Sequence, residues 1–312
     1  MTKPAVLQVC SYPEWDQTLL DQAYRVHRYD LAADKPGLLA QVGPQIRGIA
    51  TNGGVGVMPA VLAACPNLEI ISIYGVGYDA VDIAACQARG IRVTNTPDVL
   101  TGDCADLAVG MLLALSRGIV KAEAWARSGE WQQAPFPLQR RVWGSRVGIL
   151  GLGRIGEEVA RRMEGFGCQI AYSARSVKPV GWQFIPDPVA LASWSDTLIL
   201  TAVANAATRH IVNAAVLRAL GPEGLFVNIS RAANVDEEAL LQALAQGTIA
   251  GAALDVFESE PAFDPRFLDL PNVLLQPHHA SGTVQTRKAM GQLMRDNLTA
   301  HFAGKPLLTP VV

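Results

Sequence analysis

A glycine-rich turn constrains the fold of this chain more than any other feature of its sequence. Residues 147–156 read Val-Gly-Ile-Leu-Gly-Leu-Gly-Arg-Ile-Gly, an apolar strand that runs directly into G-x-G-x-x-G and then into a helical pattern. We expect Gly151 to permit the tight turn, Gly153 to let the backbone approach a pyrophosphate, and Gly156 to let the helix lie close to the strand. A lone G-x-G-x-x-G is weak evidence, but the flanking strand and helix together predict a dinucleotide site with its phosphates at the helix N-terminus.

The next predicted strand indicates which dinucleotide binds. An NAD site places an acidic residue about 20 positions beyond the glycines to accept the ribose hydroxyls, and here that position holds Ser173. Arg175 can bind a 2′-phosphate through two charge-assisted hydrogen bonds, and Ser173 and Ser176 can add neutral donors. The alternative is that Arg175 is an ordinary solvated residue. We therefore expect NADP(H) as the cofactor, in preference to NAD(H).

Short apolar runs alternate with helical patterns along the whole sequence, which predicts an α/β fold with parallel sheets. Because 312 residues are about twice the length of a typical domain, we expect two domains. The predicted strands include residues 5–10, 69–73, 92–94, 147–150, 169–172, 197–200, 225–229 and 251–255. The predicted helices include residues 82–89, 101–117, 236–246 and 283–302, and residues 130–143 read as an irregular surface connection.

Composition excludes several classes of partner. A net charge of -2 argues against nucleic acid or an anionic membrane, because both favour a basic surface. No apolar run is long enough to span a bilayer, and the first residues lack the pattern of a signal peptide. Five scattered cysteines suggest neither a disulfide framework nor a zinc site. We expect a cytoplasmic protein with free thiols and no metal.

Arg231, Glu260 and His278 each lie just past the end of an apolar run, where open α/β sheets bind ligands. Reduction of a 2-keto acid requires a planar, permanently charged group for the carboxylate, which arginine supplies. It also requires an acid for the carbonyl oxygen, and histidine titrates near neutral pH. A nearby carboxylate would orient that imidazole and favour its charged form. Singly each residue is more often structural, but together they favour this chemistry.

Together these segments resemble the D-isomer-specific 2-hydroxyacid dehydrogenase family over nearly the whole chain, and they are most similar to its glyoxylate/hydroxypyruvate reductase branch. The motifs that carry the resemblance are Tyr74-Gly-Val-Gly77-Tyr-Asp79, Asn95-Thr-Pro97-Asp98, the glycine turn, Asn228-Ile-Ser-Arg231, Asp255-Val-Phe-Glu-Ser-Glu260-Pro261 and Pro277-His278. The resemblance implies two Rossmann-like domains. Residues 1–95 and 286–312 would form a smaller, discontinuous, flavodoxin-like substrate domain, and residues 96–285 the dinucleotide-binding domain.

The resemblance also implies roles for individual residues. Arg231 would bind and polarise the keto acid, His278 would be the acid/base and Glu260 its partner. Asp255 would hold the nicotinamide end, and the remaining cofactor contacts would include Thr101, Arg154, Ile155 and Ile229. The substrate would meet the N–H groups of Val76 and Gly77, the side chain of Ser281, and a pocket wall that includes Tyr74 and Leu100, with Trp131 and Phe136 as further candidates. Tyr74 has the alternative role of a buried aromatic residue at a strand end.

Two positions depart from the family pattern. Ala232 stands where glycine is usual, and His279 stands where an apolar residue is usual. We assign the acid to His278 because it directly follows Pro277, and His279 remains the alternative.

The residues leave three activities open: an NADPH-dependent reductase of glyoxylate, hydroxypyruvate or 2-ketogluconate, an NAD-dependent D-2-hydroxyacid dehydrogenase, and a non-enzymatic dinucleotide sensor of corepressor type. We also expect a homodimer, with the long apolar helix at residues 101–117 as its candidate interface.

Overall fold

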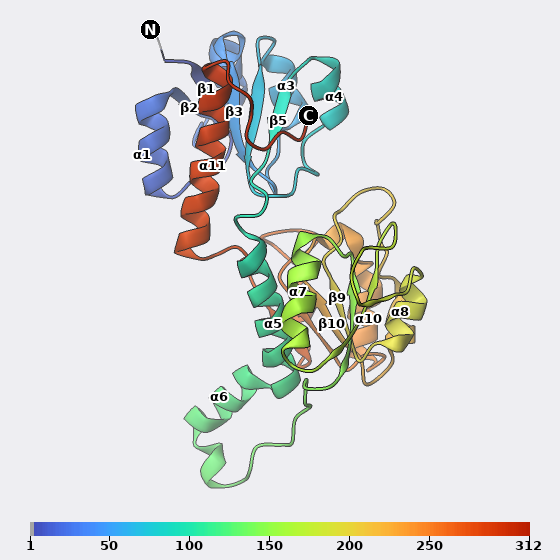
Figure 1. Cartoon of the computed structure of the whole chain (residues 1–312). Helices are drawn as coiled ribbons and strands as arrows, with labels where there is room; N and C mark the ends of the chain where they lie inside the picture. The colour runs from blue at the N-terminus through green and yellow to red at the C-terminus, as the bar shows by residue number, and fades with distance from the viewer. Residues whose placement is uncertain (1–2) are drawn as a thin grey trace. The chain divides into compact units, whose positions relative to one another are not determined.

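The computed structural model describes residues 3–312, which divide into two compact units. The first unit comprises residues 3–100 and 282–312, and the second comprises residues 101–281. Each unit contains one sheet in which every pairing is parallel (Figure 1). The chain passes between the two units at residues 100–101 and 281–282. No helix between residues 3 and 312 is long and apolar enough to cross a bilayer.

The sheet of the first unit has five strands in the order β2-β1-β3-β4-β5, which is the flavodoxin-like order. Its strands are β1 (Ala5–Gln8), β2 (Arg25–Arg28), β3 (Gly48–Asn52), β4 (Ile70–Tyr74) and β5 (Arg92–Thr94). Its helices are α1 (Glu14–Ala23), α2 (Lys35–Val42), α3 (Pro59–Ala64), α4 (Ile83–Ala88) and α11 (Val284–Phe302), which returns from the end of the chain. The central strands β1, β3 and β4 are almost wholly buried, as expected for a parallel sheet covered on both faces.

Helix α11 is fixed to this sheet by polar contacts as well as by packing. The hydroxyl of Ser72 donates to the carbonyl of Met294 at 2.9 Å, and an ion pair of buried side chains joins Arg295 to Asp16 of α1. A Cβ at Gly291 would lie 2.0 Å from Asp16 Oδ1, so only glycine fits where these helices meet. The expected helix 283–302 therefore belongs to the first unit although it follows the second in sequence.

The second unit has seven strands in the order β12-β11-β10-β9-β6-β7-β8. The strands are β6 (Arg146–Leu150), β7 (Gln169–Ser173), β8 (Gln183–Phe184), β9 (Thr197–Leu200), β10 (Leu225–Asn228), β11 (Gly251–Leu254) and β12 (Val273–Leu275). The helices are α5 (Thr101–Arg117), α6 (Ile119–Ser128), α7 (Arg154–Glu164), α8 (Pro188–Trp194), α9 (Ala214–Leu220) and α10 (Glu237–Ala245). Strand order reverses between β6 and β9, which is where a doubly wound sheet binds its ligand.

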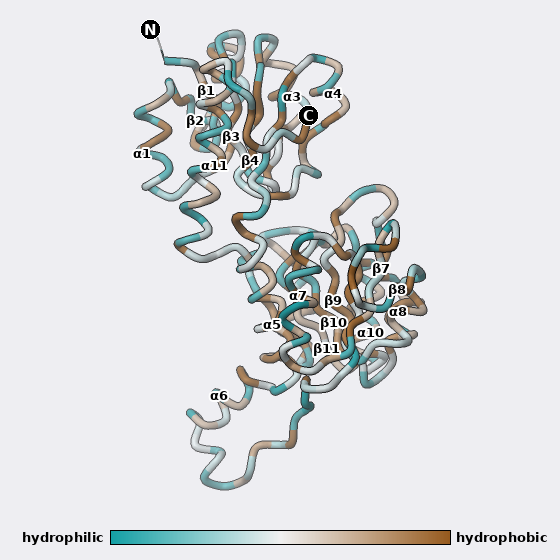
Figure 2. Tube along the Cα trace, viewed as in Figure 1, coloured by the Kyte–Doolittle hydropathy of each residue, from teal (hydrophilic) through white to brown (hydrophobic). Residues whose placement is uncertain are grey.

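Burial explains the role of α5. Its residues Ala105, Ala108 and Leu112 are fully buried, and the helix packs on α7 and on β10 and β11 of its own unit. Figure 2 shows the apolar strands of the second unit inside and a hydrophilic face along α7. One face of α5 therefore covers the sheet, and the expected role of this helix in a subunit interface stays a prediction.

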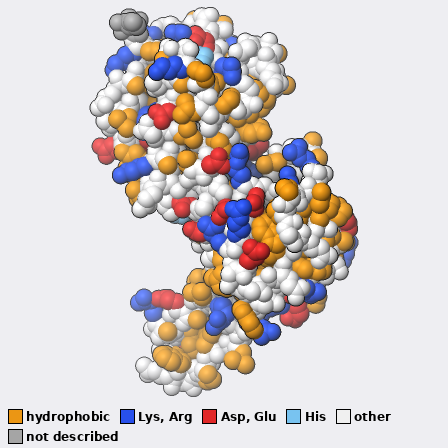
Figure 3. Space-filling view, in the orientation of Figure 1, with side chains coloured by type: hydrophobic (Ala, Val, Ile, Leu, Met, Phe, Trp, Pro, Cys, Tyr) orange, Lys and Arg blue, Asp and Glu red, His pale blue; other side chains and the backbone are white. Residues whose placement is uncertain are grey.

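Helix α6 and residues 129–143 extend away from the sheet of the second unit (Figure 1), and we call this segment, residues 119–143, the arm. No residue of α6 is buried. The arm folds on itself, with the rings of Trp125 and Phe136 edge to face at 5.8 Å between centroids. Exposed apolar side chains gather on it (Figure 3), namely Ile119, Val120, Trp131, Leu138 and Trp143.

Candidate active site

The glycine turn after β6 has the geometry that its sequence predicts. Gly151 has a φ of 106°, and a Cβ there would lie 2.5 Å from the backbone of Ala202. A Cβ at Gly156 would lie 2.6 Å from the carbonyl oxygen of Gly151, so helix α7 lies close to the turn. At Gly153, by contrast, a Cβ would lie within 4 Å of no atom from residues 3–312, apart from its two neighbours in the chain. The space beside Gly153 thus fits a group from outside the protein, as a bound pyrophosphate would require.

Helix α7 begins directly at this turn. Gly153 is its N-cap residue, and Arg154, Ile155 and Gly156 form its first turn. The first N–H groups of a helix have no partner within the helix, and they carry positive potential. The residues present therefore fit the phosphates of a dinucleotide.

The end of β7 carries no carboxylate. Ser173 is 6% exposed, and its hydroxyl donates to the carbonyl of Pro186 at 2.9 Å. The hydroxyl proton of Ser173 is therefore used in a hydrogen bond within the protein. This differs from the expectation that Ser173 donates to a 2′-phosphate. Arg175 and Ser176 are exposed, so both remain accessible to a ligand.

Glu260 and His278 form a hydrogen-bonded pair. His278 Nδ1 and Glu260 Oε2 lie 2.6 Å apart, and the amide of Phe257 donates to Glu260 Oε1 at 2.9 Å. Burial tends to raise the pKa of Glu260, but these hydrogen bonds and the charges of His278 and Arg231 outweigh it, so the pKa is lowered. The ionised carboxylate fixes the orientation of the imidazole ring through Nδ1. The ring of His279 has no such partner among residues 3–312.

Asp255 fixes the backbone that carries these histidines. It follows β11, is fully buried, and its two carboxylate oxygens accept the amides of His279 at 2.6 Å and Ala280 at 2.9 Å. Burial is the largest influence on its pKa, which is raised despite the two hydrogen bonds. His278 itself has a φ of 50°, in the left-handed region. Asp255 thus stabilises the turn that presents His278.

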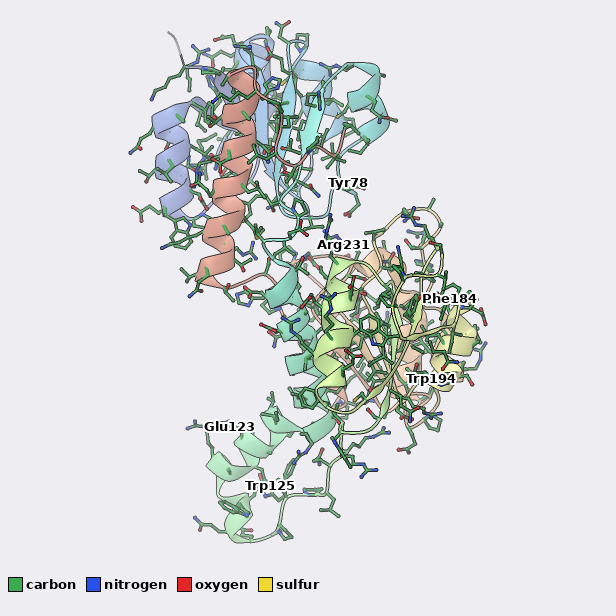
Figure 4. The ribbon with its side chains drawn as sticks, in the orientation of Figure 1. Tyr78, Glu123, Trp125, Phe184, Trp194 and Arg231 are labelled. Carbon is green, nitrogen blue, oxygen red and sulfur yellow. The ribbon has the colours of Figure 1, made fainter. Side chains whose placement is uncertain are left out.

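Arg231 follows β10 at the start of a short 3-10 helix, Ala232–Asn234 (Figure 4). Its guanidinium donates to the carbonyl of Ser230 at 2.8 Å. The turn is held by Asn228, whose side-chain oxygen accepts the amide and the hydroxyl of Ser230, both at 2.9 Å. Asn234, which is fully buried, donates to the carbonyl of Ala202 at 2.9 Å. Sequence reasoning did not single out Asn234, because one asparagine in a loop carries no signal by itself.

The expected substrate residues of the first unit are Tyr74 at the end of β4, Val76 and Gly77 in the loop that follows, and Leu100. The amides of Val76 and Gly77 donate to no acceptor within residues 3–312, and both residues are half-buried. Tyr74 is 5% exposed and its hydroxyl donates to the carbonyl of Arg287 at 2.7 Å. This geometry favours the alternative role of Tyr74, a buried aromatic residue at a strand end, over a hydrogen bond to substrate. Leu100 is likewise 6% exposed.

The other residues expected at the cofactor and the substrate lie near the ends of helices and strands or on the arm. Thr101 is the first residue of α5, Ile229 follows β10 and is 8% exposed, and Ser281 is half-buried in the segment after His278. Of the candidates for the pocket wall, Trp131 and Phe136 lie on the arm, and Trp131 is 70% exposed.

A family model described as D-isomer specific 2-hydroxyacid dehydrogenase, NAD binding domain, matches residues 109–280. The chain belongs to this family. Glyoxylate/hydroxypyruvate reductase A of Arabidopsis thaliana is 44% identical over 100% of both chains. The 2-ketogluconate reductase of Gluconobacter oxydans is 42% identical over 100% of this chain and 99% of its own.

Solved structures agree with this membership. The 2-hydroxyacid dehydrogenase of Ketogulonicigenium vulgare is 65% identical, with a TM-score of 0.94 over 100% of this chain and 99% of that one. An NADPH-dependent glyoxylate/hydroxypyruvate reductase of Sinorhizobium meliloti, solved with NADP and malonate, is 42% identical, with a TM-score of 0.92 over 100% of this chain and 97% of that one. The family's two-domain α/β arrangement is therefore that of this chain.

Proposed function

We propose that this chain is an NADPH-dependent reductase that converts small 2-keto acids to D-2-hydroxy acids. The observation that carries the proposal is the His278–Glu260 pair, 2.6 Å apart, with the charge of Arg231 acting on the same carboxylate. An acid, its partner and a fixed cation are the groups that reduction of a 2-keto acid requires. Relatives named as glyoxylate/hydroxypyruvate and 2-ketogluconate reductases support the same reaction.

NADPH, when bound, supplies the hydride that adds to C2 of the keto acid. Arg231 binds the substrate carboxylate and polarises the carbonyl oxygen, on which negative charge develops. His278 donates the proton to that oxygen, and Glu260 stabilises the imidazolium before transfer and orients the ring through Nδ1. Asp255 maintains the turn on which His278 sits and bounds the nicotinamide end of the site.

The unpartnered amides of Val76 and Gly77 provide a second set of donors for the substrate carboxylate. Ser281 contacts the substrate from the segment after His278. The malonate present in the Sinorhizobium meliloti relative supports a carboxylate-binding site in proteins of this kind. Glyoxylate, hydroxypyruvate and 2-ketogluconate share the carboxylate and the adjacent carbonyl, so all three are proposed substrates.

The absence of a carboxylate at Ser173 and the exposed guanidinium of Arg175 support NADPH over NADH, together with the NADP in that relative. Thr101, Arg154, Ile155, Ser176 and Ile229 complete the proposed cofactor site. The five cysteines are free, which supports a cytoplasmic location.

An NADPH-oxidation assay against a panel of 2-keto acids tests this function. We expect oxidation with glyoxylate and hydroxypyruvate, a lower kcat/KM with NADH, and loss of activity in Arg231→Ala. A non-enzymatic sensor would bind NADPH without oxidising it on any member of the panel, and a dehydrogenase specific for NAD would prefer NADH.

We also propose that the protein is a homodimer, and that the arm forms its interface together with the expected helix α5. Trp131 and Leu138 are 70% and 99% exposed. Exposed apolar side chains gathered on one segment mark an interaction surface. A second copy presenting the same arm would bury them symmetrically.

A further inference from the structure

The loop that follows β4 is held from behind by the segment after β5. The amide of Thr96 donates to the carbonyl of Gly75 at 2.8 Å, and the amide of Gly75 donates to Thr96 Oγ1 at 3.0 Å. The side-chain amide of Asn95 donates to the carbonyl of Val76 at 2.9 Å. Thr96 is fully buried, so these contacts are shielded from water. The backbone carbonyls of Gly75 and Val76 therefore both accept hydrogen bonds.

These contacts set the direction of the two free amides. A peptide group is planar and trans, so its C=O and its N–H point in opposite directions. The carbonyl of Gly75 shares its peptide group with the amide of Val76, and the carbonyl of Val76 shares its own with the amide of Gly77. Holding the two carbonyls thus orients both N–H groups away from residues 95–96. Gly75 has a φ of 150°, a conformation that favours glycine.

Asn95 is in turn held by residues from the end of the sequence. The hydroxyl of Thr309 donates to the carbonyl of Asn95 at 2.6 Å, and the amide of Asn95 donates to the carbonyl of Thr309 at 3.4 Å. Asn297 of α11, which is fully buried, donates to Thr309 Oγ1 at 2.8 Å. Its side-chain oxygen accepts the amides of Leu308 and Thr309 at 3.0 and 3.1 Å.

Each hydrogen bond in this network joins a donor that has a proton to an acceptor that has a free lone pair. The Thr309 hydroxyl has one proton, which it gives to Asn95, so it can accept the proton of Asn297. The Thr309 hydroxyl holds the backbone carbonyl of Asn95, and the side-chain amide of Asn95 donates to the backbone carbonyl of Val76. The network runs Asn297–Thr309–Asn95–Val76 entirely within the first unit.

We propose that Asn95 is a positioning residue for the substrate carboxylate, and that Thr309 holds Asn95 in place for this role. The inference rests on the proposed function, in which the amides of Val76 and Gly77 bind that carboxylate. Asn95 touches neither the substrate nor the reacting atoms. It fixes the peptide group whose N–H belongs to Gly77, so its loss weakens binding of the keto acid and leaves the cofactor site unaffected.

Steady-state kinetics of three variants test the proposal: Asn95→Ala, Thr309→Val and Thr309→Ser. We expect Asn95→Ala to raise the KM for hydroxypyruvate about tenfold. Without Asn95, the N–H of Gly77 is no longer held in the direction from which it hydrogen-bonds the substrate carboxylate. Thr309→Val keeps the shape of the side chain without its hydroxyl and should raise this KM several-fold. Thr309→Ser retains the hydroxyl and should match the wild type.

The split between kinetic constants separates positioning from general damage. We expect the KM for NADPH to stay within about twofold and kcat within about threefold in all three variants. A keto-acid KM that is unchanged in both Asn95→Ala and Thr309→Val would overturn the inference, as would equal rises in both KM values. If Asn95→Ala fails to fold, the comparison of Thr309→Val with Thr309→Ser still tests the inference. Equal KM values for hydroxypyruvate in these two variants would then overturn it. A wild-type protein that reduces no 2-keto acid would instead overturn the proposed function, and this inference with it.

Discussion

At the scale of single residues, the two neighbouring histidines have different environments. Glu260 contacts His278 Nδ1, whereas His279 contributes its backbone amide to Asp255. The sequence favoured His278 because it directly follows Pro277, but His279 stayed the alternative because a one-residue shift leaves the local pattern unchanged. The choice depends on the turn that Asp255 stabilises, which is a tertiary contact.

Replacing His278 should therefore affect chemistry, and replacing its neighbour should not. We expect His278→Ala to lower kcat by about 100-fold or more while NADPH still binds, because the proton donor is lost. His279→Ala is the matched control and should remain within a few-fold of the wild type. Single-turnover experiments measure the rate of reduction, and fluorescence titrations measure the binding of NADPH. The reverse pattern would assign the acid to His279.

Arg175 is the residue on which cofactor choice should depend. We expect Arg175→Ala to raise the KM for NADPH about tenfold or more, because a bidentate contact with the 2′-phosphate is lost. The KM for NADH should change little. Arg218→Ala removes an equally exposed arginine from the last turn of α9 and serves as the control. Equal effects of Arg175→Ala on both cofactors would reject the role.

The lowered pKa of Glu260 predicts a pH-dependent contribution to stability. Because its folded pKa lies below the ordinary value of 4.5, ionised Glu260 stabilises the fold above that value. This contribution is lost as the pH falls through the folded pKa. The difference in Tm between the wild type and Glu260→Gln should therefore be larger at pH 7 and shrink progressively below about pH 5. A difference that grows on acidification would contradict this sign.

At the scale of elements, strong patterns predicted the structure well and weak ones did not. The strands at 92–94 and 197–200 and the helix at 101–117 have the expected bounds. The strand at 197–200 and the helix are clear apolar patterns with defined ends. Strand β2 was missed because Arg25–Arg28 is polar and lies at a sheet edge. Strand β3 was missed because it begins with glycine and ends with the polar residues Thr51 and Asn52. Helix α6 has no buried residue, so its sequence lacks the apolar stripe of a core helix.

The arm is the element that should control oligomeric state. We expect the double variant Trp131→Ser, Leu138→Ser to sediment as a monomer at concentrations where the wild type is a dimer, because exposed apolar area is removed from the interface. Leu268→Ser, which changes a 67% exposed leucine outside the arm, is the control and should remain dimeric. A wild type that is monomeric at working concentration would end the proposal.

At the scale of the whole molecule, the residues of the proposed site come from segments far apart in sequence. Arg231, Glu260 and His278 follow β10, β11 and β12, three adjacent parallel strands whose carboxyl ends lie at one edge of the sheet. This regularity allowed the sequence to predict that the three side chains lie at the same edge of one sheet. The support from Asn234, Asn297 and Thr309 was not predictable, because it depends on which distant loops meet.

The most direct measurement of the central claim is the fate of the transferred hydrogen. The protein should be incubated with hydroxypyruvate and NADPH that carries deuterium at both positions of nicotinamide C4. We expect one deuterium at C2 of the product, only the D enantiomer, and no such product in His278→Ala on the same timescale. Deuterium absent from C2, or a product of L configuration, would contradict the account.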